Sequence, residues 1–254
     1  MIANSQFAYA SALRDQLPHG RRWLDLGCGH EFLPSWMEEP SRLPSPEGAW
    51  IVGVDRDRAA IRRHPHLRVR VIADIQRLPL RATLFDLVTA NMVIEHLDAP
   101  QALFREVGRV LAPGGTFLVH TPNLDGYTTR LTRYIPQSLR PALARVLLNR
   151  KEEDVYPTHY RGNTPAALHE LARVGQLEVV RLETVLSSPQ LYRVPGVGRL
   201  EDRLLKMLSN DRWQHWRPCI IAQFAKPHAP HCSSVPAVER PLPHTSTAPR
   251  TESR

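Results

Sequence analysis

The sequence lacks the features that mark membrane-spanning, secreted and metal-binding proteins. No apolar run reaches the roughly 18 residues that a membrane-spanning helix needs, and residues 1–11 lack the basic-then-apolar layout of a secretion signal. The three cysteines, Cys28, Cys219 and Cys232, lie far apart and show no spacing typical of disulfide frameworks or metal ligands. We therefore expect a cytoplasmic protein with reduced thiols and no metal site.

Acidic residues are absent from one stretch of a chain that is basic overall. The 254 residues carry a formal net charge of +8, and residues 126–151 hold several arginines and no Asp or Glu. Apolar residues alternate with the arginines there, which predicts one or two basic amphipathic helices. Four interpretations remain open: a nucleic-acid face, a peripheral membrane contact through residues 128–148, a lid over an anionic substrate, or a solvated helix face.

Large apolar residues become scarce after Lys226, where prolines lie among Ser, Thr, His and Ala. Such a segment cannot bury enough apolar surface to fold, so residues 227–254 are predicted to form a disordered tail. The remaining residues, 1–226, are predicted to form one domain with a basic helical insertion at about 126–160.

Apolar runs with strand and helix periodicity alternate along these 226 residues. Strands are expected at 22–26, 50–55, 67–72, 85–90, 116–121, 176–184 and 219–225, and helices at 4–17, 57–63, 99–111, 165–174 and 200–208. This order predicts an α/β fold with a doubly wound, mostly parallel seven-stranded sheet whose last strand is antiparallel.

Polar residues and glycines directly follow four of the expected strands. The first strand runs into a Gly27-Cys28-Gly29 turn, and Asp55, Asp74 and Asn91 follow the next three. Ligands of parallel sheets bind at the carboxyl ends of the strands, and an acid there suits ribose hydroxyls. The pattern indicates a ribose-containing cofactor, although each of these residues alone is also compatible with an ordinary turn or cap.

Five motifs between residues 20 and 125 together resemble the class I S-adenosylmethionine-dependent methyltransferases, in the branch that includes small-molecule, quinone and sugar O-methyltransferases. They are Leu24-Asp25-Leu26-Gly27-Cys28-Gly29, Val54-Asp55, Ala73-Asp74-Ile75 with Leu78-Pro79-Leu80, Phe85-Asp86-Leu87-Val88 leading to Glu95-His96-Leu97, and Leu111-Ala112-Pro113-Gly114-Gly115. The resemblance implies a Rossmann-like sheet and S-adenosylmethionine as the cofactor.

The resemblance also implies roles for residues at the strand ends. The glycines would let the backbone approach the methionyl part of the cofactor, with Cys28 as a small filler between them. Asp25 would face the ammonium side, Asp55 the ribose, and Asp74 with the Ile75 amide the adenine. The full implied set is Asp25, Gly27, Cys28, Gly29, Asp55, Arg56, Asp74, Ile75 and Asn91, the last through its backbone carbonyl.

The turn departs from the family pattern where a third glycine is common, because Glu31 stands there. An acid is favoured at the start of a helix, so Glu31 suits a helix beginning at this point. The nicotinamide-type GxGxxG pattern would need glycine in place of Phe32, which disfavours a dinucleotide site.

His96 is the candidate general base. It follows the fourth strand and resembles a histidine that serves as base in some natural-product O-methyltransferases. Histidine as a residue type suits this role, because its unperturbed pKa of about 6.5 lets it take a proton from a hydroxyl. The alternative is that Glu95 and His96 only shape the loop. Residues 158–161 resemble a lid segment, and candidate acceptor-pocket residues are His120, Tyr127, Tyr156, His159 and Tyr160.

The function expected from these features is methylation of a small-molecule, sugar or lipid-linked acceptor at oxygen. The basic segment keeps an RNA acceptor as an alternative, although Asn91-Met92-Val93 lacks the Pro-Pro-aromatic pattern of nucleic-acid amino methylases. A binding module that holds S-adenosylmethionine without catalysis is the third interpretation. The oligomeric state is not predicted from the sequence.

Overall fold

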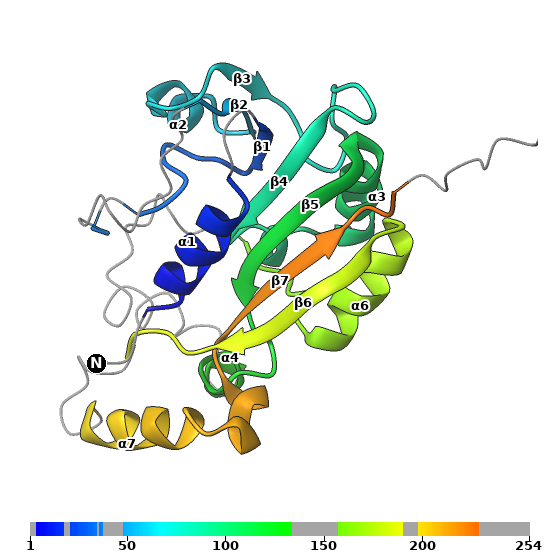
Figure 1. The fold of residues 1–254 in the computed structure, drawn as a ribbon. Coiled ribbons are helices and arrows are strands. Elements are labelled where there is room, and N and C mark those ends of the chain that lie inside the picture. Colours follow the sequence, from blue (N-terminus) through cyan, green and yellow to red (C-terminus); the bar gives the residue numbers. More distant parts are fainter. Residues whose placement is uncertain are drawn as a thin grey trace, which may run out of the picture.

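A seven-stranded sheet with the order β3-β2-β1-β4-β5-β7-β6 forms the centre of the molecule (Figure 1). A computed structural model describes residues 4–17, 21–34, 36–37, 48–133, 157–189 and 198–228. The strands are β1 (Arg22–Leu26), β2 (Trp50–Asp55), β3 (Val69–Ile72), β4 (Phe85–Asn91), β5 (Leu111–Pro122), β6 (Glu178–Val185) and β7 (Cys219–Ala225).

Strand directions confirm the predicted mixed sheet. The pairs β1–β2, β1–β4, β2–β3 and β4–β5 are parallel, whereas β7 runs antiparallel to both β5 and β6. In the parallel register Leu26 lies opposite Val54 and Ala90, and Asn91 lies opposite His120. The residues that follow β1, β2, β3 and β4 therefore meet at one edge of the sheet.

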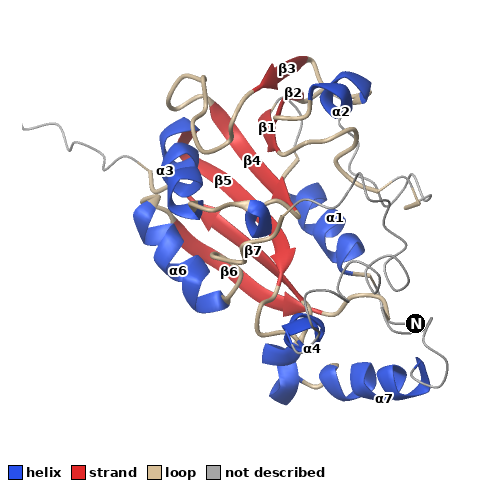
Figure 2. Cartoon of the chain, turned by 180° about the vertical axis from the view of Figure 1, so that it is seen from behind, coloured by secondary structure: helices blue, strands red, loops and turns tan. Residues whose placement is uncertain are grey.

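Helices cover both faces of the sheet, as the alternating pattern predicts. On one face lie α3 (Pro100–Val110) and α6 (Pro165–Val174), and on the other α1 (Ser5–Asp15), with α2 (Arg58–Arg63) beside β2 and β3 (Figure 2). Asn4, Asp57 and Thr164 cap the first turns of α1, α2 and α6 with their side-chain oxygens. These caps explain why three of the helix starts can be read from the sequence.

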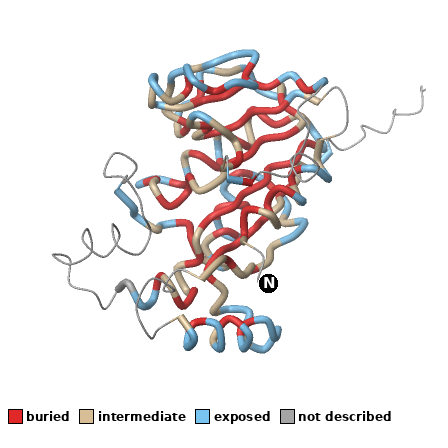
Figure 3. Tube along the Cα trace, turned by 90° about the vertical axis from the view of Figure 1, so that its left-hand side faces the viewer, coloured by how far each residue is buried: buried red, intermediate tan, exposed pale blue. Residues whose placement is uncertain are grey.

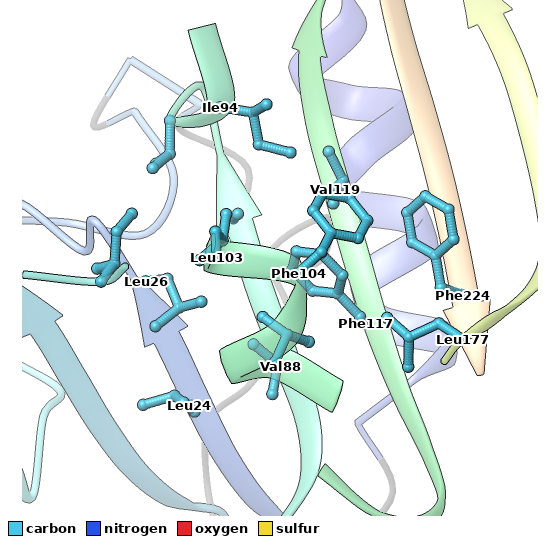
Figure 4. Packing of buried hydrophobic residues seen from close by; sticks show 14 of the residues in the cluster. Leu24, Leu26, Val88, Ile94, Leu103, Phe104, Phe117, Val119, Leu177 and Phe224 are labelled. Carbon is cyan, nitrogen blue, oxygen red and sulfur yellow. The ribbon is translucent and has the colours of Figure 1, made fainter. Parts of the chain in front are cut away.

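Aromatic side chains form the centre of the larger hydrophobic core. Phe104 of α3 packs edge-on against Phe117 of β5 and Phe224 of β7, with ring centroids 5.3 and 5.5 Å apart (Figure 4). Edge-to-face packing at this spacing is favourable for aromatic rings. The central strands are mostly buried, whereas the edge strands β3 and β6 and the peripheral α7 (Gly198–Leu208) are exposed or half-buried over much of their length (Figure 3).

The prediction that Pro113-Gly114-Gly115 precedes the fifth strand was wrong, because β5 already begins at Leu111. Gly114 donates a backbone hydrogen bond to Lys226 and Gly115 accepts one from it, which extends the ladder past β7. The pairing with β4 is irregular between Phe85 and Leu87, and a proline is tolerated at such a bulge. A short helix, η4 (Asp211–Trp216), was also not expected.

The basic segment is described only at its start, where α4 (Tyr127–Arg133) forms. Arg130 lies 4.9 Å from the Trp216 ring centroid and 3.9 Å from an Asp125 carboxylate oxygen. Residues 134–156 and 229–254, which hold most of the predicted insertion, membrane contact and tail, lie outside the described residues. Within the described part of the chain, no helix has the length and apolar character to cross a membrane.

Candidate functional site

The turn after β1 adopts a backbone that favours glycine at two positions. Gly27 and Gly29 have φ angles of +63° and +52°, in the left-handed region. The Gly27 amide donates to the Val54 carbonyl at 2.8 Å, which ties the turn to β2. A Cβ at Gly27 would lie 2.6 Å from Val93, so the turn packs directly on the loop that carries His96.

We expect alanine to act differently at these two glycines. Both substitutions meet the left-handed backbone, which costs roughly 1–2 kcal/mol, and Gly27→Ala adds a clash with Val93 worth about 1–3 kcal/mol more. A Cβ at Gly29 would meet no atom of the described residues within 4 Å. Urea denaturation should therefore show the larger loss of unfolding free energy for Gly27→Ala, and equal losses would contradict this packing.

Cys28 points away from the open side of the turn. Its side chain is 3% exposed, and a Cβ at Gly53 would lie 2.7 Å from its sulfur. Burial raises the pKa of the Cys28 thiol above its ordinary value, which keeps it a neutral thiol. This packing supports the interpretation of Cys28 as a small filler.

Asp55 joins the turn to the end of β2. One carboxylate oxygen accepts from the Gly29 amide at 2.8 Å, and the other accepts from the Asp57 amide at 2.8 Å. Each carboxylate oxygen has two lone pairs, so each retains one for a further donor. Asp55 is thus both an anchor of the glycine turn and a candidate acceptor for two hydroxyl groups.

Asp74 lies beyond β3 and pairs with Arg56. Partial burial favours the protonated acid, but hydrogen bonds from the Gln76 amide and Arg56 outweigh it and lower the pKa of Asp74. The Arg56 side chain is 69% exposed and Asp74 is 38% exposed, so the pair lies at the surface. Ile75 is 7% exposed and packs into the larger core.

Asp25 is a buried carboxylate under the turn. Trp23 donates from its indole nitrogen to the Thr89 hydroxyl at 2.7 Å, and Thr89 donates to Asp25 Oδ1 at 2.5 Å. The other oxygen, Oδ2, has no hydrogen-bond partner among the described residues. Burial raises the pKa of Asp25 to about 7, despite the opposing hydrogen bond from Thr89.

The raised pKa makes folding stability depend on pH in a definite direction. In the unfolded chain the carboxyl has a pKa of about 3.9, so between about pH 4 and 7 the folded state holds a proton that the unfolded state has lost. The contribution of Asp25 to the unfolding free energy is therefore highest at low pH, falls as the pH rises from about 4 to 7, and stays low above pH 7.

Asp25→Asn keeps the shape of the side chain and removes this titration. Its unfolding free energy relative to wild type should rise from pH 4 to pH 8 by up to about 4 kcal/mol in urea denaturation. Buried His64 and His120, whose pKa values burial lowers to about 4 and about 3, give the opposite slope in both proteins and cancel in the difference. If the difference in unfolding free energy between Asp25→Asn and wild type stays constant with pH, the raised pKa of Asp25 is contradicted.

The Asn91 side chain serves the fold. Its amide donates to Gln6 of α1 at 3.1 Å and to the Phe32 carbonyl at 3.2 Å, while its oxygen lies 2.8 Å from His120 Nδ1. His120 is fully buried and stacks on Tyr9, with ring centroids 5.5 Å apart. Asn91 therefore holds α1 and the glycine loop together, which leaves only its backbone for the predicted cofactor contact.

His96 ends a short helix, η2 (Ile94–His96), directly after β4. Its Nδ1 lies 2.9 Å from the Pro157 carbonyl oxygen, and its Nε2 lies 3.9 Å from a Glu95 carboxylate oxygen. The imidazole is 27% exposed. The structure thus joins Pro157, which directly precedes the segment 158–161 expected as a lid, to the loop that carries the candidate base.

The other candidate pocket residues differ in burial, and only some of them reach the surface. Tyr127 is 3% exposed and donates to Glu201 at 2.8 Å, so like His120 it belongs to the buried framework. His159 is exposed and Tyr160 is half-buried, whereas Tyr156 lies outside the described residues.

Sequence reasoning missed the residues that support the site from distant elements, namely Thr89, Pro157 and Asn163. Thr89 shares a strand face with Asn91, so the two-residue period of β4 was a usable signal for it. No local pattern pointed to Pro157, since 61 positions separate it from His96. In the described ranges, no three His, Cys, Asp or Glu side chains gather as a metal site.

Comparisons with known proteins agree with the fold described above. A family model described as a methyltransferase domain matches residues 5–182. The chain is 31% identical over 147 residues to the demethylmenaquinone methyltransferase of Corynebacterium urealyticum, covering 56% of this chain and 60% of that protein. It is 31% identical over 102 residues to the malonyl-(acyl-carrier protein) O-methyltransferase of Hahella chejuensis, covering 39% and 35%. The matches thus span less than two thirds of either relative.

A solved structure shares the fold. The S-adenosylmethionine-dependent methyltransferase of Methanosarcina mazei superposes with a TM-score of 0.55 at 15% identity, covering 86% of this chain and 98% of that one.

The residues present fit S-adenosylmethionine. Gly29 leaves open space beside the turn, and the buried Asp25 Oδ2 can accept from an ammonium group. Asp55 retains lone pairs for ribose hydroxyls at the carboxyl end of a parallel strand. With the family match over residues 5–182, the chain belongs to the S-adenosylmethionine-dependent methyltransferases of the methyltransferase domain family.

Proposed function

We propose that this chain methylates a small-molecule, sugar or lipid-linked acceptor at oxygen, with His96 as the general base. S-adenosylmethionine, when bound, supplies a methyl group activated by the positive sulfonium. The task left to the protein is to align an acceptor hydroxyl, exclude water and remove its proton. By their names, the two relatives named above act on demethylmenaquinone and on malonyl-acyl-carrier protein, and the second acts at oxygen, which supports a non-nucleic-acid acceptor for this chain.

The observation that carries the proposal is the contact between His96 and Pro157. A backbone carbonyl only accepts hydrogen bonds, so the His96 Nδ1 at 2.9 Å from it must carry hydrogen. In the neutral imidazole the lone pair then lies on Nε2, which is the form that a general base requires.

The remaining candidate residues would bind the cofactor. Asp55 would accept from the ribose hydroxyls, Asp74 and the Ile75 amide would face the adenine, and Asn91 would offer its carbonyl to the methionyl ammonium. Arg56 would border the adenine side through its pair with Asp74. Asp25 would complement the ammonium from beneath the turn.

The test is a transfer assay with methyl-labelled S-adenosylmethionine and a panel of acceptors: a hydroxylated quinone, malonyl-acyl-carrier protein, a sugar, and total RNA. The proposal expects label on a hydroxyl oxygen of a non-nucleic-acid acceptor, and its loss with His96→Gln. Label on the malonyl carboxylate alone, an acceptor with no proton to remove, would refute His96 as base. Label in RNA alone would support the alternative drawn from the basic segment. Micromolar binding by calorimetry without transfer to any acceptor would favour a non-catalytic module.

A further inference from the structure

Residues 157–163, which we call the strap, are tied to the loop at 94–98 by a set of hydrogen bonds centred on Glu95. We propose that Glu95 is a positioning residue, which holds the strap so that the Pro157 carbonyl keeps His96 in the Nδ1-protonated form. The inference rests on the proposed role of His96 as base and deepens it.

Main-chain contacts bind the strap along the loop. The Glu95 carbonyl accepts from the His159 amide at 2.7 Å and from the Tyr160 amide at 3.2 Å. One position further on, His96 Nδ1 donates to the Pro157 carbonyl, and Arg161 donates to the Asp98 carbonyl at 2.9 Å. Because Glu95 and His96 are adjacent, fixing the strap on the Glu95 carbonyl also fixes the position of the Pro157 oxygen.

The Glu95 side chain secures the far end of the strap from inside the protein. Asn163 donates to the Thr121 hydroxyl at 2.6 Å, and Thr121 donates to Glu95 Oε2 at 3.1 Å. Asn163 and Thr121 are fully buried and Glu95 is 4% exposed. Buried polar groups in such a series depend on one another, since losing one removes a hydrogen bond from its neighbour. The strap, β5 and the His96 loop are therefore coupled.

Backbone strain in the strap indicates that its hydrogen bonds to the loop at 94–98 and to Thr121 hold its backbone in this conformation. Tyr160 has a φ angle of +52°, a conformation that a non-glycine residue rarely adopts and that surrounding contacts must maintain. Gly162 fits closely here, because a Cβ at this position would lie 3.0 Å from the Ile94 side chain of the same loop.

The carboxylate of Glu95 has a second consequence for His96. Its Oε1 lies 3.9 Å from Nε2, the atom that accepts the proton in the proposed reaction. A negative charge at this distance stabilises the imidazolium that forms. Glu95 thus acts on both ring nitrogens, on Nδ1 through the strap and on Nε2 by charge, without contacting the acceptor.

The test breaks the series at three points and reads out the His96 ring directly. In protein labelled with 15N-histidine, long-range proton–nitrogen spectra distinguish the two neutral tautomers, and the His96 signal is identified by its loss in His96→Gln. Wild type should show hydrogen on Nδ1. Thr121→Val and Asn163→Ala should populate the other tautomer and lower kcat by about 10- to 100-fold, with KM for S-adenosylmethionine within about twofold.

Three further variants separate positioning from general destabilisation. Thr116→Val makes the same change in the middle of the same strand, where Thr116 pairs with Leu87 and Ala225, and should leave tautomer and kcat as in wild type. Glu95→Gln retains an oxygen that accepts from Thr121 and should keep the Nδ1-protonated form, while its lost charge still lowers kcat. Glu95→Ala should lose both the Nδ1-protonated form of His96 and the negative charge near Nε2.

Each outcome decides between the inference and its alternatives. An unchanged His96 tautomer in folded Thr121→Val and Asn163→Ala would overturn the positioning role. A changed tautomer together with full activity in His96→Gln would leave the strap's effect in place and refute His96 as base. Should Glu95→Ala fail to fold, Thr121→Val and Asn163→Ala still give the answer.

Discussion

Replacing Asp55 with alanine is expected to weaken the binding of S-adenosylmethionine by at least about 100-fold. The carboxylate holds the Gly29 and Asp57 amides at 2.8 Å, and the same oxygens would receive the ribose hydroxyls. A hydrogen bond to a charged group contributes about 1.5–3 kcal/mol, and each 1.4 kcal/mol is tenfold in affinity. The alanine variant would lose two such hydrogen bonds to the ribose, and the turn would lose the carboxylate that holds its shape. The expected loss of affinity therefore exceeds about 100-fold. Isothermal titration calorimetry measures the change.

Asp86→Ala is the matched control for this experiment. Asp86 also accepts from a backbone amide, that of Arg22 at 2.9 Å, but at the amino end of β4, away from the proposed cofactor edge. Its removal should leave the dissociation constant within about twofold. Comparable affinity losses in the two variants would point to a general effect on the fold, and unchanged affinity in Asp55→Ala would remove Asp55 from the cofactor site.

His96→Ala should lower kcat by roughly 10²- to 10⁴-fold and leave the dissociation constant for S-adenosylmethionine nearly unchanged. A positioned general base contributes rate accelerations of this size, and the candidate cofactor residues lie on other elements. Stopped-time transfer assays on the acceptor found by the panel give kcat, and calorimetry gives the affinity.

The control is His169→Ala, an exposed histidine on α6. It should retain wild-type kcat, which excludes a general effect of losing an imidazole. A His96→Ala variant that keeps kcat within threefold would show that Glu95 and His96 only shape the loop. The experiment therefore separates the two interpretations of the Glu95-His96 pair.

Most of the sheet followed from the sequence because its signals are local. The spans of β1, β2 and β7 match the predicted ranges, since each is a short apolar run ended by an acid, a glycine or a change in composition. α6 also matches, because Thr164 and Pro165 begin it and Gly175 ends it. The start of β5 was predicted too late because Pro113, Gly114 and Gly115 near its beginning resemble a turn, whereas Gly114 and Gly115 pair with Lys226 in the sheet.

The sequence by itself determined the succession of strands and helices along the chain and the identity of the residues at the carboxyl ends of the strands, because alternation, caps and glycine turns involve residues close together in the chain. Only the tertiary structure decided the chemical states of Asp25 and His96. Thr89 lies 64 positions from Asp25, and Pro157 lies 61 positions from His96. Burial and hydrogen bonding set protonation, and both depend on neighbours in space that these distant segments supply.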